Sequence, residues 1–255
     1  MEPVIEVRNL YKTFDEGKSF VLKGLDLKIP KGLITILIGY SGTGKSVLLK
    51  HILGLFKPTK GEVIVLGQNL FDMEEEELIR FRTRLGVLFQ HAALFDDMTV
   101  LENVTFPLRE HRRDLSPQEI IEKAIEKLKS SGLDPSHYDK QPSELSSGMQ
   151  KRVGLARALV LEPAILLYDE PTTGLDPILT GMVDNLIMET HKKHKGSTSV
   201  VVTHDLGAAF RIGDYVVMLD KGKVLLEGAP EVFLESDIEV VRHFVEKGLR
   251  RSEDV

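Results

Sequence analysis

The sequence predicts an α/β fold in which helices cover a core of buried parallel strands, with a helical insertion in the middle of the chain. Three observations predict it. A buried strand, a glycine-rich turn and a helix follow one another near the N-terminus; residues 92–163 have helical patterns; and strand–helix alternation returns after residue 164. The 255 residues contain no repeat, low-complexity tract or Pro/Ser-rich linker, so we expect one compact unit.

The first third of the chain has mainly strand patterns. Leu25, Leu27 and Ile29 alternate with polar residues, which predicts a strand with one buried face. Residues 33–38 form an apolar run typical of a strand inside a covered parallel sheet. Glycines follow, and apolar residues over 47–53 then recur at helical spacing. These segments therefore predict a strand, a glycine turn and a helix.

The middle of the chain, residues 92–163, is predicted to be largely helical. Segments 99–102 and 116–119 each begin with Thr or Ser and end with Glu, a capping-box pattern that marks a helix start. Gly132 is typical of the end of the second of these helices. We expect a third helix over residues 147–161, stopped by Pro163.

Strand–helix alternation returns in the last third. Residues 165–168 and 199–203 are predicted to be buried parallel strands. The helix between them opens at Asp176-Pro177 and closes with His and Lys residues at 191–195, where cations suit the negative helix end. A hairpin is expected over residues 215–227.

Charge and composition exclude several classes of function. The chain has 33 Lys and Arg against 39 Asp and Glu, a net charge of −6, so we expect no nucleic-acid partner. The absence of cysteine excludes disulfides, thiolate metal sites and cysteine nucleophiles. No apolar run approaches the roughly 18 residues that span a bilayer. We therefore expect a soluble protein, which leaves docking on a membrane protein open.

Residues 39–46 match the P-loop pattern GxxxxGK[ST]. In such a loop, backbone N–H groups surround phosphate oxygens at a positive helix end. We expect Lys45 to reach the β- and γ-phosphates and the Ser46 hydroxyl to bind Mg²⁺. A glycine turn that binds nothing is the alternative, and the placement between an apolar strand and a helix disfavours it. The predicted nucleotide-binding set here is Gly39, Tyr40, Ser41, Gly42, Thr43, Gly44, Lys45, Ser46 and Val47.

The apolar strand at 165–168 ends in two carboxylates, Asp169 and Glu170. We expect Asp169 to hold the metal, directly or through water, and Glu170 to act as general base for a water attacking the γ-phosphate. Taken alone, such a pair is typical of a solvated loop; a P-loop in the same chain favours an active site. The guanine-reading motif [NT]KxD is absent, which disfavours a GTPase.

The remaining motifs resemble those of the ABC ATPases. Residues 145–150, Leu-Ser-Ser-Gly-Met-Gln, are similar to the LSGGQ signature of that family. Gln90, at the end of a predicted strand, resembles the Q-loop glutamine, and residues 174–176 resemble the D-loop. His204 resembles the switch histidine, and Phe14 occupies the place of the aromatic that stacks on adenine.

The resemblance spans roughly residues 4–230 and implies the ABC ATPase fold. One domain, residues 1–255, would hold a RecA-like P-loop core with an N-terminal antiparallel β subdomain at 1–91 and 164–255, and a helical subdomain with the signature at 92–163. The implied cofactors are ATP and Mg²⁺. The implied catalytic residues are Lys45, Gln90, Glu170 and His204. The implied metal ligands are Ser46, Gln90 and Asp169. Further implied nucleotide contacts are Phe14, Ser146, Ser147, Gly148 and Asp176.

The signature departs from LSGGQ at two positions. Ser147 replaces the first glycine and Met149 replaces the glutamine, whereas Ser146 and Gly148 remain. A serine at 147 would crowd the nucleotide unless its backbone dihedral is ordinary. We expect a working signature with altered affinity or rate.

The resemblance also implies that two chains act together. The chain holds one P-loop and one signature, and in ABC ATPases the signature helix faces the nucleotide of the opposite protomer. A positive helix end facing the γ-phosphate suits its charge. We therefore expect an ATP-dependent head-to-tail homodimer, whose work is delivered to membrane-embedded subunits that dock near Gln90 and the helical insertion.

Residues 93–111, with the pattern ALFDxMTVxENVxFPLREH, resemble the ATPases of Mla/MCE-type phospholipid transporters. Gly148-Met149 and residues 241–245 point the same way. The implied partners are an MlaE-type transmembrane permease, an MCE-domain protein and a small STAS-domain subunit. The implied substrate is a glycerophospholipid or related lipid, and the implied location is peripheral, on the cytoplasmic face of the inner membrane.

Other functions share some of these features. An ATPase for amino acids or other polar solutes would have every catalytic motif, and so would a soluble ABC ATPase without a permease. A degenerate nucleotide-binding module is suggested by Ser147 and Met149, although the catalytic residues are intact. Taken singly, Phe14 favours a core aromatic and Gln90 a simple strand end. The acidic run 74–77 is expected to be a solvated helix start.

Overall fold

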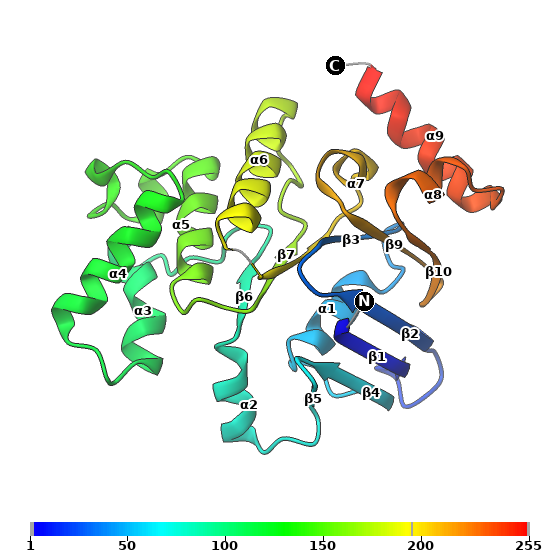
Figure 1. Cartoon of the computed structure of the whole chain (residues 1–255), viewed down its shortest axis with the longest axis horizontal. Coiled ribbons are helices and arrows are strands. Elements are labelled where there is room, and N and C mark those ends of the chain that lie inside the picture. The colour runs from blue at the N-terminus through cyan, green and yellow to red at the C-terminus, as the bar shows by residue number, and fades with distance from the viewer. Residues whose placement is uncertain (1–2, 195, 254–255) are drawn as a thin grey trace.

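The computed structural model describes residues 3–194 and 196–253, and the side chains of residues 3–194 and 196–246. Two sheets form its frame, a four-stranded sheet in the order β2-β1-β4-β5 and a six-stranded sheet in the order β10-β9-β3-β8-β7-β6. Figure 1 shows the first sheet at the lower right and the helices α3, α4 and α5 gathered at the left. The α/β fold predicted from the sequence is confirmed.

The smaller sheet is antiparallel and packs on the first helix, α1 (Lys45–Ile52). Leu25, Leu27 and Ile29 are all buried, so the predicted one-sided strand is confirmed. They join one apolar cluster with Leu48 of α1, which fixes the helix beneath the sheet. The strands of this sheet are β1 (Pro3–Lys12), β2 (Leu22–Pro30), β4 (Lys60–Val65) and β5 (Gln68–Asn69).

The larger sheet is parallel except for its edge strand β10, which pairs antiparallel with β9. Every residue of β3 and β8 is buried, because helices cover both faces of such a sheet. The strand predicted at 199–203 begins and ends one residue earlier. The strands are β3 (Ile34–Ile38), β6 (Leu85–Leu88), β7 (Ile165–Asp169), β8 (Thr198–Val202), β9 (Tyr215–Asp220) and β10 (Lys223–Gly228).

The segment between β6 and β7 is helical and has an apolar cluster of its own, which includes Val104, Leu128 and Val153. Both predicted capping boxes form, at Thr99 and at Ser116. The third helix ends at Leu159 rather than 161, and Glu162 turns the chain with a φ of 55°. The elements are α3 (Val100–His111), α4 (Pro117–Ser130), the 3₁₀ turns Pro135–His137 and Pro142–Glu144, and α5 (Ser147–Leu159).

The other helices cover the larger sheet or lead into it. Asp176 caps the N-terminus of α6 by accepting a hydrogen bond from Leu179 N at 2.9 Å, as its sequence predicts. None of the described helices has the length and apolar character needed to cross a bilayer. These helices are α2 (Glu75–Arg82), α6 (Pro177–Lys193), α7 (Leu206–Ile212), α8 (Pro230–Leu234) and α9 (Glu239–Glu253).

The parallel strands determine where the site lies. β3, β6, β7 and β8 are parallel neighbours, so their carboxyl ends lie along the same edge of the sheet. The P-loop follows β3, Gln90 lies two residues beyond β6, Glu170 follows β7 and His204 lies two residues beyond β8. Ligands bind at this edge in open α/β sheets.

Candidate nucleotide site

The P-loop between β3 and α1 can be built only with glycine at two of its positions. Gly39 has a φ of 149°, and a Cβ there would collide with the Leu219 carbonyl oxygen of β9. Gly44, the residue before α1, has a φ of 105°, and its Cβ would lie 2.7 Å from Leu22 Cδ2. The loop therefore wraps closely around the helix N-terminus, where backbone N–H groups attract anions.

Lys45 is held inside this loop and is only 6% exposed. Its Nζ donates to the carbonyl oxygens of Gly39 and Tyr40, at 2.8 and 3.1 Å. Burial lowers the pKa of Lys45, while the negative charges of Glu170 and Asp169 oppose that shift. The ammonium is thus placed at the P-loop, ready to face phosphate oxygens.

Thr43 completes the P-loop turn, since its Oγ1 donates to the Tyr40 carbonyl oxygen at 2.9 Å. Ser41, Gly42 and Ser46 are exposed, so their polar groups are open to a ligand. Val47, within the first turn of α1, is half-buried.

Glu170 and His204 come together from neighbouring strands. The Glu170 carboxylate oxygen Oε2 lies 2.7 Å from His204 Nδ1 and accepts a hydrogen bond from Thr173 Oγ1 at 2.8 Å. The Glu170 backbone N–H donates to Val202 O at 2.8 Å. Glu170 itself has a φ of 50°, an unfavourable value for a side-chain-bearing residue. Such strain concentrates at functional sites, where the surroundings hold the residue in place.

Asp169 has a buried carboxylate oxygen, Oδ1, to which none of the described residues donates a hydrogen bond. Burial raises the pKa of Asp169, and the negative charge of Glu170 raises it further. A buried, unpaired carboxylate is unfavourable unless a cation neutralises it. Mg²⁺ takes one or two protein oxygens and completes its shell with phosphate and water. Asp169 together with the Ser46 hydroxyl therefore fits a Mg²⁺ ion.

Gln90 is linked to the signature helix by a residue that sequence analysis missed. Lys151 of α5 is 4% exposed, and its Nζ donates to Gln90 O at 2.9 Å and also to Pro171 O. Lys151 therefore ties α5 to the chain after β6 and to the chain after Glu170. A lysine next to a signature motif carries no sequence signal for burial, so its role required the structure.

The signature residues lie at the exposed N-terminus of α5. Ser146 caps the helix, its Oγ accepting from Met149 N at 3.3 Å. Ser147 is the first residue of α5 and lies outside the left-handed region of backbone angles, so its dihedral is ordinary. A Cβ at Gly148 would meet only Leu179 Cδ2, at 3.8 Å. In Figure 1, α5 lies in the left part of the molecule, separated from α1 by β6 and β7. One chain therefore does not bring its signature to its own P-loop.

Phe14 and Tyr40, two aromatic residues of the predicted nucleotide-binding set, make their ring contacts in different places. Phe14 is 59% exposed, so it is not a core residue. Its ring lies edge-on to Phe56 at 5.4 Å, beyond the C-terminal end of α1 rather than at the P-loop end. The Tyr40 ring of the P-loop instead meets Phe244 of α9 at 5.1 Å. Phe244 was also missed, because a contact across 204 positions (244 − 40) leaves no local pattern.

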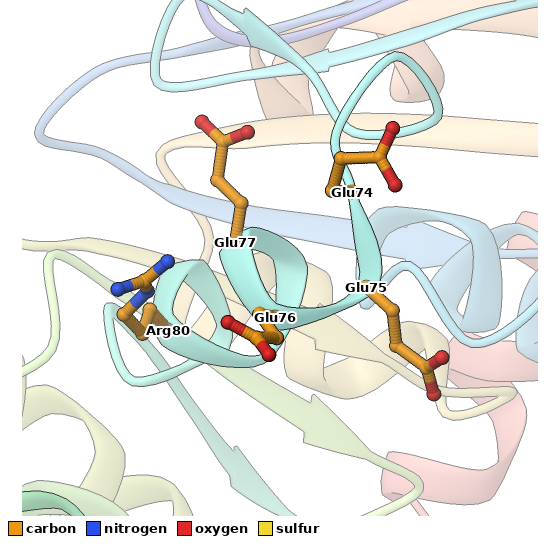
Figure 2. A pocket seen from close by; sticks show the side chains of 5 residues that line it. All are labelled: Glu74, Glu75, Glu76, Glu77 and Arg80. Carbon is orange, nitrogen blue, oxygen red and sulfur yellow. The ribbon is translucent and has the colours of Figure 1, made fainter.

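The acidic run at residues 74–77 lies at the start of α2, as predicted, and all of it is exposed. Figure 2 shows its carboxylates spreading in different directions, with Arg80 beside them. Among the residues that the structure describes, no three His, Asp or Glu side chains are grouped to hold a metal ion. The hollow there is a solvated helix start favoured by the helix dipole.

Comparison with known proteins gives the family to which this chain is similar. The ABC transporter family matches residues 22–173. The probable ribonucleotide transport ATP-binding protein Mkl of Mycobacterium leprae is 42% identical over 96% of this chain and 69% of its own length. The intermembrane phospholipid transport system ATP-binding protein MlaF of Haemophilus influenzae is 41% identical over 94% of this chain and 89% of its own. This chain spans about two thirds of the length of the mycobacterial relatives.

Relatives with other substrates are similar to nearly the same degree. The histidine/lysine/arginine/ornithine transport ATP-binding protein HisP of Escherichia coli is 41% identical over 90% of this chain and 91% of its own. Among solved structures, the dimeric ATP-binding cassette MJ0796 in a post-hydrolysis state, bound to ADP and Pi, superposes with a TM-score of 0.79. It is 35% identical and covers 89% of this chain and 98% of its own.

The fold and the site define a P-loop ATPase. The family match over residues 22–173 and the relatives above show that this chain belongs to the ABC transporter ATPases. It is an MlaF-like ATP-hydrolysing subunit of a transporter.

Proposed function

We propose that this chain powers the movement of phospholipid between membranes through a partner permease and an MCE-domain protein. The observation that supports phospholipid as the substrate is the similarity to MlaF, at 41% identity over 94% of this chain. Residues 93–111, which resemble the Mla/MCE-type ATPases, support it. The similarity to HisP makes amino-acid transport the second candidate.

Within the site, Glu170 is the general base that takes a proton from the attacking water. His204, 2.7 Å from Glu170, orients that carboxylate and faces the γ-phosphate. Lys45 and the P-loop N–H groups neutralise the phosphates. Ser46, Asp169 and Gln90 would hold Mg²⁺, which would neutralise charge on the β- and γ-phosphates. On the family resemblance, Phe14 is the proposed adenine-stacking residue, and stacking would require its exposed ring to leave Phe56, which it contacts beyond the C-terminal end of α1.

A second copy of the chain completes the site. Helix α5, which begins at Ser147, lies across β6 and β7 from α1 in Figure 1, and a helix N-terminus attracts anions. We place Ser146, Ser147 and Gly148, with Asp176, against the nucleotide of the partner protomer in an ATP-dependent homodimer. Hydrolysis removes the γ-phosphate that bridges the protomers, so the dimer acts as a switch for the permease.

The chain would associate peripherally with the membrane, on its cytoplasmic face, through an MlaE-type permease. An MCE-domain protein and a STAS-domain subunit are its other proposed partners. A soluble ABC ATPase without a permease is the remaining alternative, and co-fractionation with the membrane when its genomic neighbours are coexpressed separates the two.

Purification of the native complex tests whether phospholipid is the substrate. We expect an affinity-tagged chain to copurify with a permease and an MCE-domain protein, and mass spectrometry to find glycerophospholipid bound beyond its share in a tagged membrane protein solubilised in the same way. Copurification with a solute-binding protein and a bound amino acid would contradict the proposal and favour the second candidate.

A further inference from the structure

Arg211 of α7 joins two segments that flank the site. Its Nε donates to Asp184 Oδ2 of α6 at 2.7 Å, and its Nη2 donates to Asp205 Oδ2 at 2.8 Å. Asp205 follows His204 directly, and α6 begins directly after Asp176, the D-loop residue that caps it. One guanidinium thus connects the histidine loop with the helix that follows the D-loop.

The Asp184 end of this ion pair is buried, whereas the Arg211 end is partly exposed. The Asp184 side chain is 4% exposed, while that of Arg211 is 42% exposed. Burial raises the pKa of Asp184, and the hydrogen bond from Arg211 opposes that shift. A buried carboxylate is tolerated only when it is paired and hydrogen-bonded. Arg211 is therefore fixed by its bond to Asp184.

Gly207 provides the space for this guanidinium. A Cβ at Gly207 would collide with Arg211 Nη1 and lie 3.0 Å from Asp205 Oδ1. Gly207 is inside α7 and has no left-handed backbone angle, so its conformation suits any residue. In the present arrangement the guanidinium therefore occupies the space that a side chain at residue 207 would take.

Asp205 is in turn held from three sides. Its backbone N–H donates to Thr203 Oγ1 at 2.9 Å, and its Oδ1 accepts from Gly207 N at 2.8 Å. Arg211 supplies the third bond. The His204 side chain between these anchors is 49% exposed, so packing does little to fix it. The contact between the His204 imidazole and Glu170 therefore depends on the position of the His204 backbone.

We propose that Arg211 is a positioning residue for His204, holding the loop that presents the imidazole to Glu170 and linking that loop to α6 and the D-loop. This inference rests on the role proposed above for His204. Arg211 acts on the chemical step without touching the nucleotide.

A paired substitution tests the inference. Removing Arg211 alone would leave the Asp184 carboxylate buried without its partner and destabilise the fold. Arg211→Met combined with Asp184→Leu removes both charges. Leucine branches at Cγ as aspartate does, so it can fill the buried space that Asp184 occupies. We expect kcat for ATP to fall about 10- to 100-fold, the loss typical of a displaced catalytic group. KM for ATP should stay within about twofold, since substrate binding is not affected.

Two single variants sharpen the result. Arg211→Lys keeps one charge and should recover part of the lost kcat. Gly207→Ala keeps both ion-pairing residues but forces the Arg211 guanidinium to shift from its present position, so kcat should fall there too, by less than in the double variant. The matched control is Arg112→Met, because Arg112 is also 42% exposed and pairs with Asp114 through two bonds far from the site, at 2.9 and 2.8 Å. It should keep wild-type kcat.

Wild-type kcat in a folded double variant would overturn the inference. So would a loss of kcat that follows the unfolding temperature across all variants, because a purely structural role predicts that correlation. His204→Ala is the reference. Full turnover in His204→Ala would overturn the proposed role of His204, and the inference with it, whatever the Arg211 variants show.

Discussion

The carboxyl edge of the parallel sheet and the N-terminus of α5 are built in different ways. At the sheet edge, Lys45, Asp169, Glu170 and His204 are fixed within one chain by buried strands and short hydrogen bonds. At α5, Ser146 is exposed and its hydroxyl bonds only within its own helix turn. The first region is held together within one chain, and the second is exposed, where the partner protomer that we propose could reach it.

Of the substitutions considered, Glu170→Gln at the sheet edge should reduce ATP hydrolysis most. A general base contributes about 10²- to 10⁴-fold to a rate, so we expect phosphate release to fall by that factor. ATP should still bind, because the P-loop is unchanged, and the variant should accumulate as a dimer in ATP. Phosphate release and size-exclusion chromatography with light scattering measure the two effects. Glu77→Gln, an exposed glutamate of α2, is the control.

A Glu170→Gln variant that hydrolyses ATP at the wild-type rate would show that the general base has been misassigned. A variant that is monomeric in ATP would instead contradict the shared site.

Mixing two inactive variants should test the division between the regions. Lys45→Ala removes the P-loop lysine, and Gly148→Asp places a carboxylate where we expect phosphate. The fold should tolerate Gly148→Asp, since a Cβ there meets only Leu179 Cδ2 at 3.8 Å. A mixed dimer has one intact site, built from the P-loop of one chain and the signature of the other. ATPase activity should therefore return on mixing.

The comparison for this experiment is each variant mixed with itself, which should stay inactive. If the mixture stays inactive while the mixed dimer forms in ATP, the two regions do not share a nucleotide.

Ser147→Gly should have a smaller effect. Ser147 already has a helical backbone, so glycine is not needed there. The substitution removes only the side chain that we propose lies next to the partner's nucleotide. We expect kcat or ATP affinity to change about twofold, equivalent to roughly 0.4 kcal/mol. Steady-state ATPase assays and nucleotide titration measure it, with Ser143→Gly, an exposed serine outside the signature, as control. Unchanged values would show that Ser147 does not reach the nucleotide.

The sheet edge could be predicted from sequence because its determinants are local. Apolar strands such as residues 165–168 each end in a polar group, and parallel strands align those ends. The contact between Glu170 and His204 follows from that alignment. The left-handed backbone conformation of Glu170 could not be predicted, because glutamate is not a residue type that favours it.

Contacts between elements far apart in the chain could not be predicted from the sequence. Lys151, Arg211 and Phe244 each act through packing between helices or loops, and composition does not distinguish them from solvated or core residues. Phe14, which taken alone would favour the core, is exposed because it lies beyond the end of β1, where the sheet no longer covers it.

The edge-on contact between Tyr40 and Phe244 affects how the protein can be truncated or tagged. Because the Phe244 ring packs edge-on against Tyr40 of the P-loop, we expect that cutting the chain before α9 would change the affinity for nucleotide. Purification handles and fluorescent reporters are therefore best attached at the opposite terminus.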